Sequence, residues 1–325
     1  MTLLIDEHCI RKLITMDDAL AAVEEVFDAQ GTGANGGVTN VPRVRVPVSN
    51  GIVRITAAVL SYRGYYGVKI SSTAVFGRDA GRMFCLYRED DGSLAAIVQV
   101  FAMGAMRTGA ASGIATKYLA NDDASVLAVI GTGRQARTQV EAVCTVRPIS
   151  EVRVYSRDAA NVERFCVEIG KVNKNNYIRS SSLEGAVRGA DIVISATSSE
   201  APVVQGAWLK PGAHINAIGA NYEHRRELDT EAVSAARFIC ADDIEQVRYE
   251  ATDLIEPVKS GVLSWDQVHP LSSVVSGNIR GRHSREDITL FKSLGVALED
   301  VALAVRALEK AQQQGLGTPL PNLTG

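Results

Sequence analysis

The stretch VLAVIGTGRQARTQVEAV, residues 126–143, constrains the fold more than any other part of the chain. A short apolar run ends at Gly131, turns through Gly133, and gives way to an amphipathic helical pattern. The turn matches G-x-G-x-x-G/A, in which the first glycine makes the turn, the second lets the backbone approach a pyrophosphate, and Ala136 keeps helix and strand close. Unpaired N–H groups at the helix start would face the phosphates. We predict dinucleotide binding here rather than a purely structural turn, with contacts from Gly131, Thr132, Gly133, Arg134, Gln135 and Ala136.

Strand-like and helix-like segments alternate from residue 121 to residue 295. The apolar runs include SVLAVI, EVRVYS, DIVISAT, AHINAIG and RFICA. This alternation predicts a parallel, doubly wound sheet of the Rossmann type. Ligands of such sheets bind at the carboxyl ends of the strands. Ser195, Ala196 and Thr197, which end the fourth strand, are therefore predicted to touch the cofactor.

The first 120 residues have a different pattern, with strand-like segments between two helical ones. These segments are RVRVPV, GIVRITAAVL, YGVKISSTAVF, RMFCLYRED and SLAAIVQVF, and the turn EDDGS between the last two predicts a hairpin. We expect an α+β domain with a mostly antiparallel sheet. The amphipathic pattern GVALEDVALAVRALEKAQQQG is too long for a crossover helix, so we predict that it returns to this domain. The expected domains are 1–120 together with 296–325, and 121–295.

Composition and charge exclude several functions. The net charge is −3, which argues against nucleic acid or an anionic membrane as the partner. The five cysteines are odd in number and have no C-x-x-C pair, so neither a zinc site nor a disulfide framework is expected. The histidines lack ligand spacing, and no metal is predicted. Free thiols, acidic residues near the start and the lack of a long apolar run indicate a cytoplasmic protein.

The end of the second alternating strand indicates which dinucleotide binds. NAD-binding folds place an acidic residue there to hold the ribose 2′-OH, whereas this chain has Ser156 and Arg157. A hydroxyl and a guanidinium suit a 2′-phosphate, because arginine can bind it through two charge-assisted hydrogen bonds. We therefore predict NADP(H) over NAD(H). Asp158 lies one residue further and could bind a ribose 2′-OH, so NAD(H) stays an alternative cofactor. Arg157 could instead be a solvated surface residue without a role in cofactor binding.

Several further motifs occur in an order typical of one protein family. They are MRTGAASGIATKYL, GADIVISAT, PGAHINAIGA, RELD and FKSLGVALED. With them the chain resembles the ornithine cyclodeaminase/mu-crystallin family from about Asp6 to Ala311. The resemblance implies a substrate-binding and dimerisation domain built from the N-terminal part and the C-terminal helix. It also implies homodimers that pair these domains.

The resemblance further implies how a substrate carboxylate is held. The best register places the clamping cations of the family on Arg43, Lys69 and Arg107, with Arg45 as the alternative to Arg43. Such a clamp needs cations, preferably arginine, in a partly dry pocket, so that the substrate α-carbon faces the nicotinamide. Thr108 is predicted to reach a phosphate or a substrate oxygen. For each cation the alternative is a solvated surface residue.

Hydride transfer to an imine also needs an acid/base, because only the protonated imine is a good hydride acceptor. The family places Asp229 of RELD near the substrate nitrogen, although from the residues alone it is equally a helix N-cap. Lys69 is a second catalytic candidate. The resemblance places the remaining predicted cofactor contacts at Ile218, Gly219, Lys292 and Ser293.

One departure from the family pattern concerns the substrate. Arg54 lies at or near a position where cyclodeaminases carry an acidic residue. A basic residue is unsuited to ornithine there and suits a second carboxylate, unless a strand slip turns Arg54 to solvent. The predicted function is an NAD(P)H-dependent reductase of a small α-imino acid, or the reverse oxidation of an α-amino acid. The alternatives are an ornithine cyclodeaminase-type lyase and a mu-crystallin-like NADPH-binding protein.

Overall fold

The structure, a computed structural model, describes residues 2–33, 37–72, 82–171, 175–222 and 224–321. The chain forms two compact units, Met1–Arg107 with Gly295–Gly325, and Thr108–Leu294. The boundary lies within helix α3 (Phe101–Leu119), whereas the boundary expected from the sequence follows residue 120. The second half of α3 is bonded to the second unit, because Gln139 donates to the Thr108 carbonyl oxygen and Asn216 donates to the Thr116 hydroxyl.

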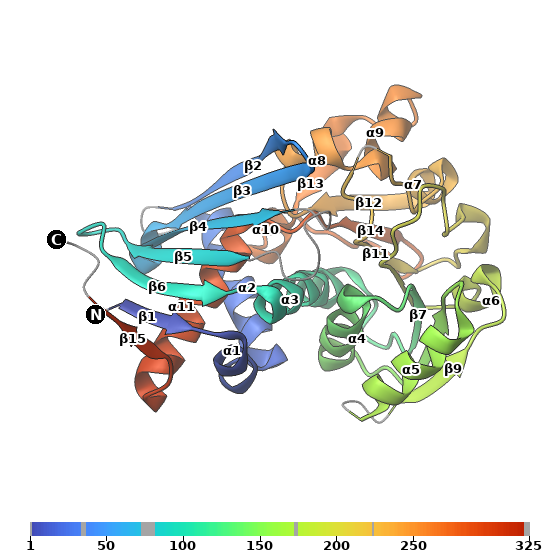
Figure 1. Ribbon diagram of the computed structural model, residues 1–325. Coiled ribbons are helices and arrows are strands. Elements are labelled where there is room, and N and C mark those ends of the chain that lie inside the picture. Colours follow the sequence, from blue (N-terminus) through green and yellow to red (C-terminus); the bar gives the residue numbers. More distant parts are fainter. Residues whose placement is uncertain (1, 34–36, 73–81, 172–174, 223, 322–325) are drawn as a thin grey trace. The chain divides into compact units, whose positions relative to one another are not determined.

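The first unit is built on a mixed sheet with the strand order β15-β1-β6-β5-β4-β3-β2 (Figure 1). Its neighbouring strands are antiparallel except β1 and β6, which confirms the predicted α+β fold with a mostly antiparallel sheet. The segment YGVKISSTAVF forms β4 as far as Ser72, and its last residues lie outside the described part. The strands are β1 Thr2–Ile5, β2 Val38–Val48, β3 Gly51–Leu60, β4 Tyr65–Ser72, β5 Met83–Arg88, β6 Leu94–Gln99 and β15 Thr318–Leu320.

Helices cover one face of this sheet. Helix α11, the predicted returning helix, contacts α2, β3 and β4, and most of its residues are buried. The side chain of Asn40 in β2 accepts the N–H groups of Ala297 and Leu298, which begin α11. A capping box of Thr15 and Asp18 begins α2. The helical segments of this unit are α1 Glu7–Leu13, α2 Met16–Thr32, the 3₁₀ turn η2 Ser61–Arg63 and α11 Ala297–Gln314.

The second unit is built on a parallel sheet with the order β13-β12-β14-β11-β10-β7-β8-β9. This confirms the predicted Rossmann-type, doubly wound sheet. The first strand, β7, lies between β8 and β10, so the strand order reverses there. The strands are β7 Val126–Ile130, β8 Glu151–Tyr155, β9 Asn176–Arg179, β10 Ile192–Ser195, β11 His214–Ala217, β12 Ala236–Ala241, β13 Val268–Pro270 and β14 Ile288–Lys292.

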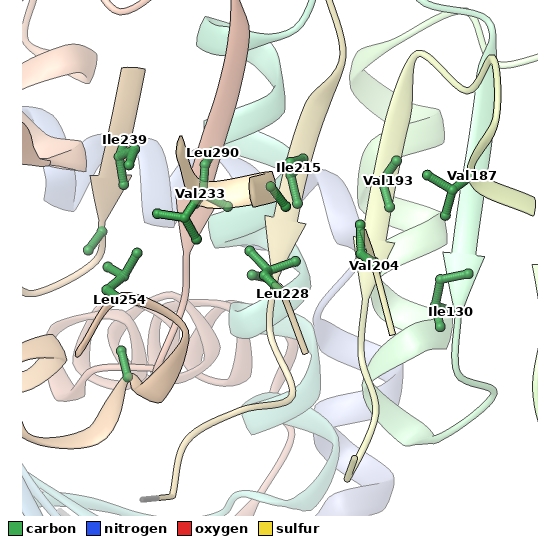
Figure 2. Close-up of a cluster of buried hydrophobic side chains, with 14 of the residues drawn as sticks. Ile130, Val187, Val193, Val204, Ile215, Leu228, Val233, Ile239, Leu254 and Leu290 are labelled. Atoms are coloured by element: carbon green, nitrogen blue, oxygen red, sulfur yellow. The ribbon is translucent and has the colours of Figure 1, made fainter. Parts of the chain in front are cut away.

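Both faces of the parallel sheet are covered, because successive residues of its strands point to opposite sides. Val129 of β7 packs with α4 and α5, whereas Ile130 belongs to the cluster formed with α6, α7, α8 and α9 (Figure 2). The helical segments are α4 Arg134–Val146, α5 Ala159–Gly170, α6 Leu183–Val187, η4 Gly206–Trp208, α7 Thr230–Ala235, α8 Ile244–Glu250, α9 Thr252–Lys259, η5 Trp265–Gln267 and α10 Leu271–Val275. Across the described residues, every helix is too short or too polar to cross a membrane.

Candidate active site

The glycine turn joins β7 to α4. Gly131 has a φ of +107°, which favours glycine, and a Cβ there would lie 2.5 Å from the Ala196 carbonyl oxygen. Gly133 is the N-cap of α4 with no side-chain cap, and a Cβ there would meet nothing within 4 Å. Ala136 is fully buried in the core between α4 and the sheet. The turn thus offers open backbone at a helix N-terminus, which fits the pyrophosphate of a dinucleotide.

Arg137, which the motif does not mark, fixes this turn. Arg137 donates to the carbonyl oxygens of Thr132 (2.9 Å) and Gly133 (3.0 Å), and its Nε donates to Glu168 of α5 (2.8 Å). Two carbonyl oxygens of the turn thus have a donor within the protein, and the Gly131 N–H donates to the Tyr155 carbonyl oxygen at 2.9 Å, so the backbone of the turn is held in one arrangement. The available signal was a cation one helical turn after Gly133. Arg134 and Gln135, two predicted contacts, are half-buried at the start of α4.

The end of β8 carries the residues predicted to select the dinucleotide. Ser156 is half-buried and Arg157 is exposed. Asp158 is the N-cap of α5, since its Oδ1 accepts the Ala160 N–H at 2.9 Å and its Oδ2 accepts the Asn161 amide at 2.8 Å. Both carboxylate oxygens of Asp158, the residue that could bind the ribose of NAD(H), therefore have partners within the protein.

The turns after β10 and β11 lie directly against each other. Ala196 and Thr197 follow β10, and Ile218 and Gly219 follow β11. A Cβ on Gly219 would lie 2.0 Å from the Thr197 carbonyl oxygen, so only glycine fits this approach. These predicted cofactor contacts are thus brought together at the carboxyl edge of the sheet, next to Gly131.

Two further predicted contacts have partners inside the second unit. Lys292 is fully buried at the end of β14 and donates to Asp253 at 2.9 Å. Ser293 donates to Asp242 at 3.1 Å. Their side chains hold the loop after β14 in place, and any contact that they make with a cofactor has to come chiefly from the backbone.

Asp229, the predicted acid/base, is the N-cap of α7. Its Oδ1 accepts the N–H groups of Ala232 (2.7 Å) and Gly206 (3.0 Å). This confirms the capping role that the sequence left open. In the described part of the chain no hydrogen bond reaches Oδ2, and the side chain is half-buried.

In the first unit, Lys69 and Arg107 converge on two acidic residues of α11. Arg107 donates through Nε to Asp300 (3.0 Å) and through Nη1 to Glu299 (2.9 Å), and Lys69 forms an ion pair with the other oxygen of Asp300. Both carboxylates are fully buried, Arg107 is 7% exposed, and the Lys69 side chain is 13% exposed. Glu299 and Asp300 lie within the motif FKSLGVALED, but their pairing with Arg107, more than 190 residues away, was not indicated by the sequence.

The three other predicted cations lie on β2 and β3. Arg43 donates to the Gly295 carbonyl oxygen at 2.9 Å, just before α11. Arg45 lies directly opposite Arg54 across the β2–β3 pair, so both point to the same side of the sheet. Thr56, two residues after Arg54, is opposite Lys69, which places Arg45 and Arg54 on the Lys69 side as well. The strand register thus turns Arg54 toward the clamp side rather than the opposite face.

Burial and ion pairing set the charges of this cluster. Burial lowers the pKa of Lys69 to about 8, although Asp300 opposes the shift, and the nearby Arg107 and Arg43 lower it further. Burial would raise the pKa of Asp300, yet Arg107 and Lys69 hold it below its ordinary value. Arg107 and Arg43 both lie close enough to Lys69 to affect its charge, so the three residues form one cationic cluster, which suits binding of a carboxylate.

The described residues contain no group of histidine, cysteine, aspartate or glutamate side chains suited to a metal ion. All five cysteines are free thiols. His214 is buried in the middle of the parallel sheet and shares a hydrogen bond of 2.9 Å with Thr289. It is therefore a packed strand residue.

Comparison with known proteins places the chain in one family. The sequence model of the ornithine cyclodeaminase/mu-crystallin family matches residues 2–315. An alanine dehydrogenase of Archaeoglobus fulgidus is 33% identical over 98% of both chains. The Δ1-pyrroline-2-carboxylate reductase of Thermococcus litoralis, solved with NADH and L-proline, superimposes with a TM-score of 0.92 at 35% identity over 98% of this chain and all of that one. An archaeal alanine dehydrogenase dimer with bound NAD gives a TM-score of 0.90 at 32% identity over 98% and 99%. The chain belongs to the ornithine cyclodeaminase/mu-crystallin family.

Proposed function

We propose that this protein is an NAD(P)(H)-dependent oxidoreductase that reduces a small α-imino acid and, in reverse, oxidises the corresponding α-amino acid. The proposal rests on the cationic cluster of Arg43, Lys69 and Arg107, in which Arg107 and Lys69 are held by the buried carboxylates Glu299 and Asp300. Cations in a partly dry pocket bind a carboxylate through charge-assisted hydrogen bonds. The substrate carboxylate is the proposed ligand of this cluster. The related T. litoralis reductase and A. fulgidus dehydrogenase support this class of reaction.

The residues of this chain divide the work between binding and proton transfer. When bound, a reduced nicotinamide supplies a hydride for the imine carbon. Arg107 is held rigidly by Glu299 and Asp300, so it orients the substrate carboxylate at little entropic cost. Arg43 adds a second cation, and Arg54 would bind a second carboxylate where the substrate has one.

Two groups are proposed to manage the proton on the substrate nitrogen. Asp229 has Oδ2 available while Oδ1 is anchored by two backbone N–H groups, which fixes its direction. Lys69, with its pKa lowered to about 8, keeps a proton at neutral pH and releases it more readily than an ordinary lysine. We assign Asp229 as the acid/base and Lys69 as the second catalytic candidate.

The cofactor of the proposed enzyme is NADP(H) in preference to NAD(H). Ser156 and Arg157 end β8, where a 2′-phosphate would lie. Asp158, the only nearby carboxylate in that turn that would favour a free ribose 2′-OH, is used as a helix cap. The relatives solved with NADH or NAD show that the family fold accepts the unphosphorylated dinucleotide, so both cofactors belong in the test.

A substrate panel with the purified protein tests this function. The panel pairs NADPH or NADH with Δ1-pyrroline-2-carboxylate, with pyruvate plus ammonia, and with oxaloacetate plus ammonia as the dicarboxylate, and it includes L-ornithine alone. We expect net oxidation of NADPH by at least one imino acid. Conversion of ornithine to proline and ammonia without net cofactor consumption would identify a lyase instead. Cofactor binding without any turnover would identify a binding protein.

A further inference from the structure

Three turns meet at the carboxyl edge of the parallel sheet. Gly131 ends β7 and abuts Ala196, and Gly219 after β11 abuts Thr197, in both cases closely enough that a Cβ would collide with backbone. Such close packing does not by itself fix the turns, because glycine adds conformational freedom. Some other group has to hold them in one arrangement.

Glu227 supplies that group. Its Oε1 accepts the N–H of Thr197 (2.6 Å) and the Thr197 hydroxyl (2.8 Å), and its Oε2 accepts the N–H groups of Gly219 (2.6 Å) and Ala220 (3.1 Å). One fully buried carboxylate thus ties the turn after β10 to the turn after β11. All four partners donate, so the ionised form is the one that satisfies them.

Asp253 and Lys292 hold the backbone at Glu227 in place. Asp253 accepts the N–H groups of Glu227 (2.7 Å) and Leu228 (2.9 Å) through Oδ1, and its Oδ2 pairs with Lys292 at 2.9 Å. All three charged side chains are fully buried. Burial and the neighbouring Asp253 raise the pKa of Glu227, although Lys292 and the donors from Thr197 oppose the shift. A stiff network of this kind is costly to build and typical of a place where geometry has to be exact to a fraction of an ångström.

The position of the network indicates what it holds. In a doubly wound sheet the pyrophosphate lies at the glycine turn after the first strand, here β7, and the adenosine half lies toward the second strand, here β8. The nicotinamide half then extends across the switch point toward the ends of β10 and β11. Those are the two strand ends that Glu227 joins.

We propose that Glu227 is a positioning residue for the nicotinamide half of the cofactor. It acts through the turns at Thr197 and Gly219, and it does not itself touch the cofactor. The inference rests on the proposed cofactor, and it gives Glu227 of RELD a role that the motif itself did not indicate. It predicts that loss of this carboxylate weakens recognition of nicotinamide while recognition of the adenosine half stays intact.

The test compares Glu227→Gln with a matched control, Asp191→Asn. Asp191 also accepts two backbone N–H groups, those of Ser125 (2.9 Å) and Val126 (2.8 Å), but it does so at the amino end of β7. Both substitutions replace one acceptor oxygen by an amide nitrogen, which donates and cannot accept. Dissociation constants are measured for NADPH and NADH by nicotinamide fluorescence and for ADP-ribose and its 2′-phosphorylated form by calorimetry, together with the melting temperature of each variant.

We expect Glu227→Gln to weaken binding of the full dinucleotide by about tenfold and to leave fragment binding within about twofold of the wild type. Asp191→Asn should lower the melting temperature without changing either affinity. If Glu227→Gln does not fold, Glu227→Asp replaces it, because it keeps the charge yet is too short to reach both turns. Equal weakening of fragment and full cofactor, or no weakening of either, overturns the proposal. Wild-type binding and turnover are measured in the same series, so failure of the proposed function would be seen separately.

Discussion

The residues of the cationic cluster differ in the pH range over which they stay protonated. Although burial opposes it, the attraction of Asp300 and Glu299 raises the pKa of Arg107 above its ordinary value. Lys69 shares Asp300 with Arg107, and burial lowers its pKa to about 8. Lys69 is therefore charged at pH 7 and mostly neutral by pH 9, whereas Arg107 is charged at both. Affinity for a carboxylate should follow the charge of Lys69.

The first prediction concerns the pH dependence of carboxylate binding. Cyclopentanecarboxylate, a ring acid with no other titrating group near neutral pH, should inhibit the reductase by competing with the substrate. We expect its affinity to fall by about tenfold between pH 7 and pH 10 as Lys69 loses its proton. In Lys69→Arg the side chain stays protonated, so the fall should disappear. If the affinity fell equally steeply in both proteins, Lys69 would not be one of the residues that bind the carboxylate.

A second prediction concerns His214 and acid stability. Burial, reinforced by the charge of Arg282, lowers the pKa of His214 to about 3, whereas the unfolded chain has an ordinary histidine. Between these two pKa values His214 is protonated in the unfolded chain and neutral in the folded protein. The free energy of unfolding is therefore at its full value above the pKa of the unfolded state and falls as the pH drops below it. At pH 5 the loss should be about 2 kcal/mol of unfolding free energy. Urea unfolding at pH 7 and pH 5 measures it.

The control for this experiment is the exposed His283. His283→Gln should keep the wild-type difference between the two pH values, whereas His214→Gln should show a smaller one. The prediction fails if His214→Gln loses as much stability at pH 5 as the wild type does.

Sequence reasoning identifies which residues carry charge and misses what they pair with. The family resemblance pointed to Lys69 and Arg107, whereas Asp300 and Glu299 belong to a helix with an ordinary amphipathic pattern. In RELD the resemblance drew attention to Asp229, whereas Glu227 makes the buried contacts. Pairings across such distances depend on the fold, and spacing in the sequence does not reveal them.

At the level of elements, the helix ends are held by residues far away in the sequence. The alternation of strands and helices and the returning helix α11 were predictable from periodicity, because each element buries one regular face. The caps were only partly predictable. Thr15 and Asp18 form the local cap of α2, whereas Asn40 caps α11 from β2, more than 250 residues away. The last carbonyl oxygens of α3 likewise depend on distant arginines.

A third prediction concerns the end of α3. Arg147 donates to the carbonyl oxygens of Lys117 (2.7 Å) and Ala120 (3.0 Å), and also to that of Asn121 (3.0 Å). Its removal takes a charged donor away from the carbonyl oxygens of Lys117 and of the buried Ala120, so Arg147→Met should lower the free energy of unfolding by about 2–3 kcal/mol. Urea denaturation of the two proteins measures the difference.

Arg179→Met is the control for this prediction. Arg179 is exposed, and its ion pair with Glu163 is long, at 3.8 Å. Such a pair contributes little, so the control should stay within about 0.5 kcal/mol of the wild type. Equal effects of the two substitutions would show that the contacts of Arg147 add nothing beyond those of a surface charge.

At the level of the whole molecule, the sheet of the first unit has one covered face and one apolar face that stays exposed. Val44, Ile55, Ile70 and Met83 lie side by side across β2, β3, β4 and β5. Val44, Ile70 and Met83 are 49%, 55% and 54% exposed. A contiguous apolar row of this kind is typical of an interface, whereas scattered apolar side chains are not.

The last prediction is that this sheet face pairs two copies of the chain. An archaeal relative is a dimer, and a row of equivalent apolar residues can be self-complementary about a two-fold axis. We expect the wild type to sediment as a dimer at micromolar concentration and Ile70→Glu to sediment as a monomer, because the carboxylate would be buried without a partner. Tyr249→Glu is the control, since Tyr249 is 73% exposed on α8, outside this row, and its replacement should leave the dimer intact. A wild type that sediments as a monomer, or a dimer that survives Ile70→Glu, would show that this face is not the interface.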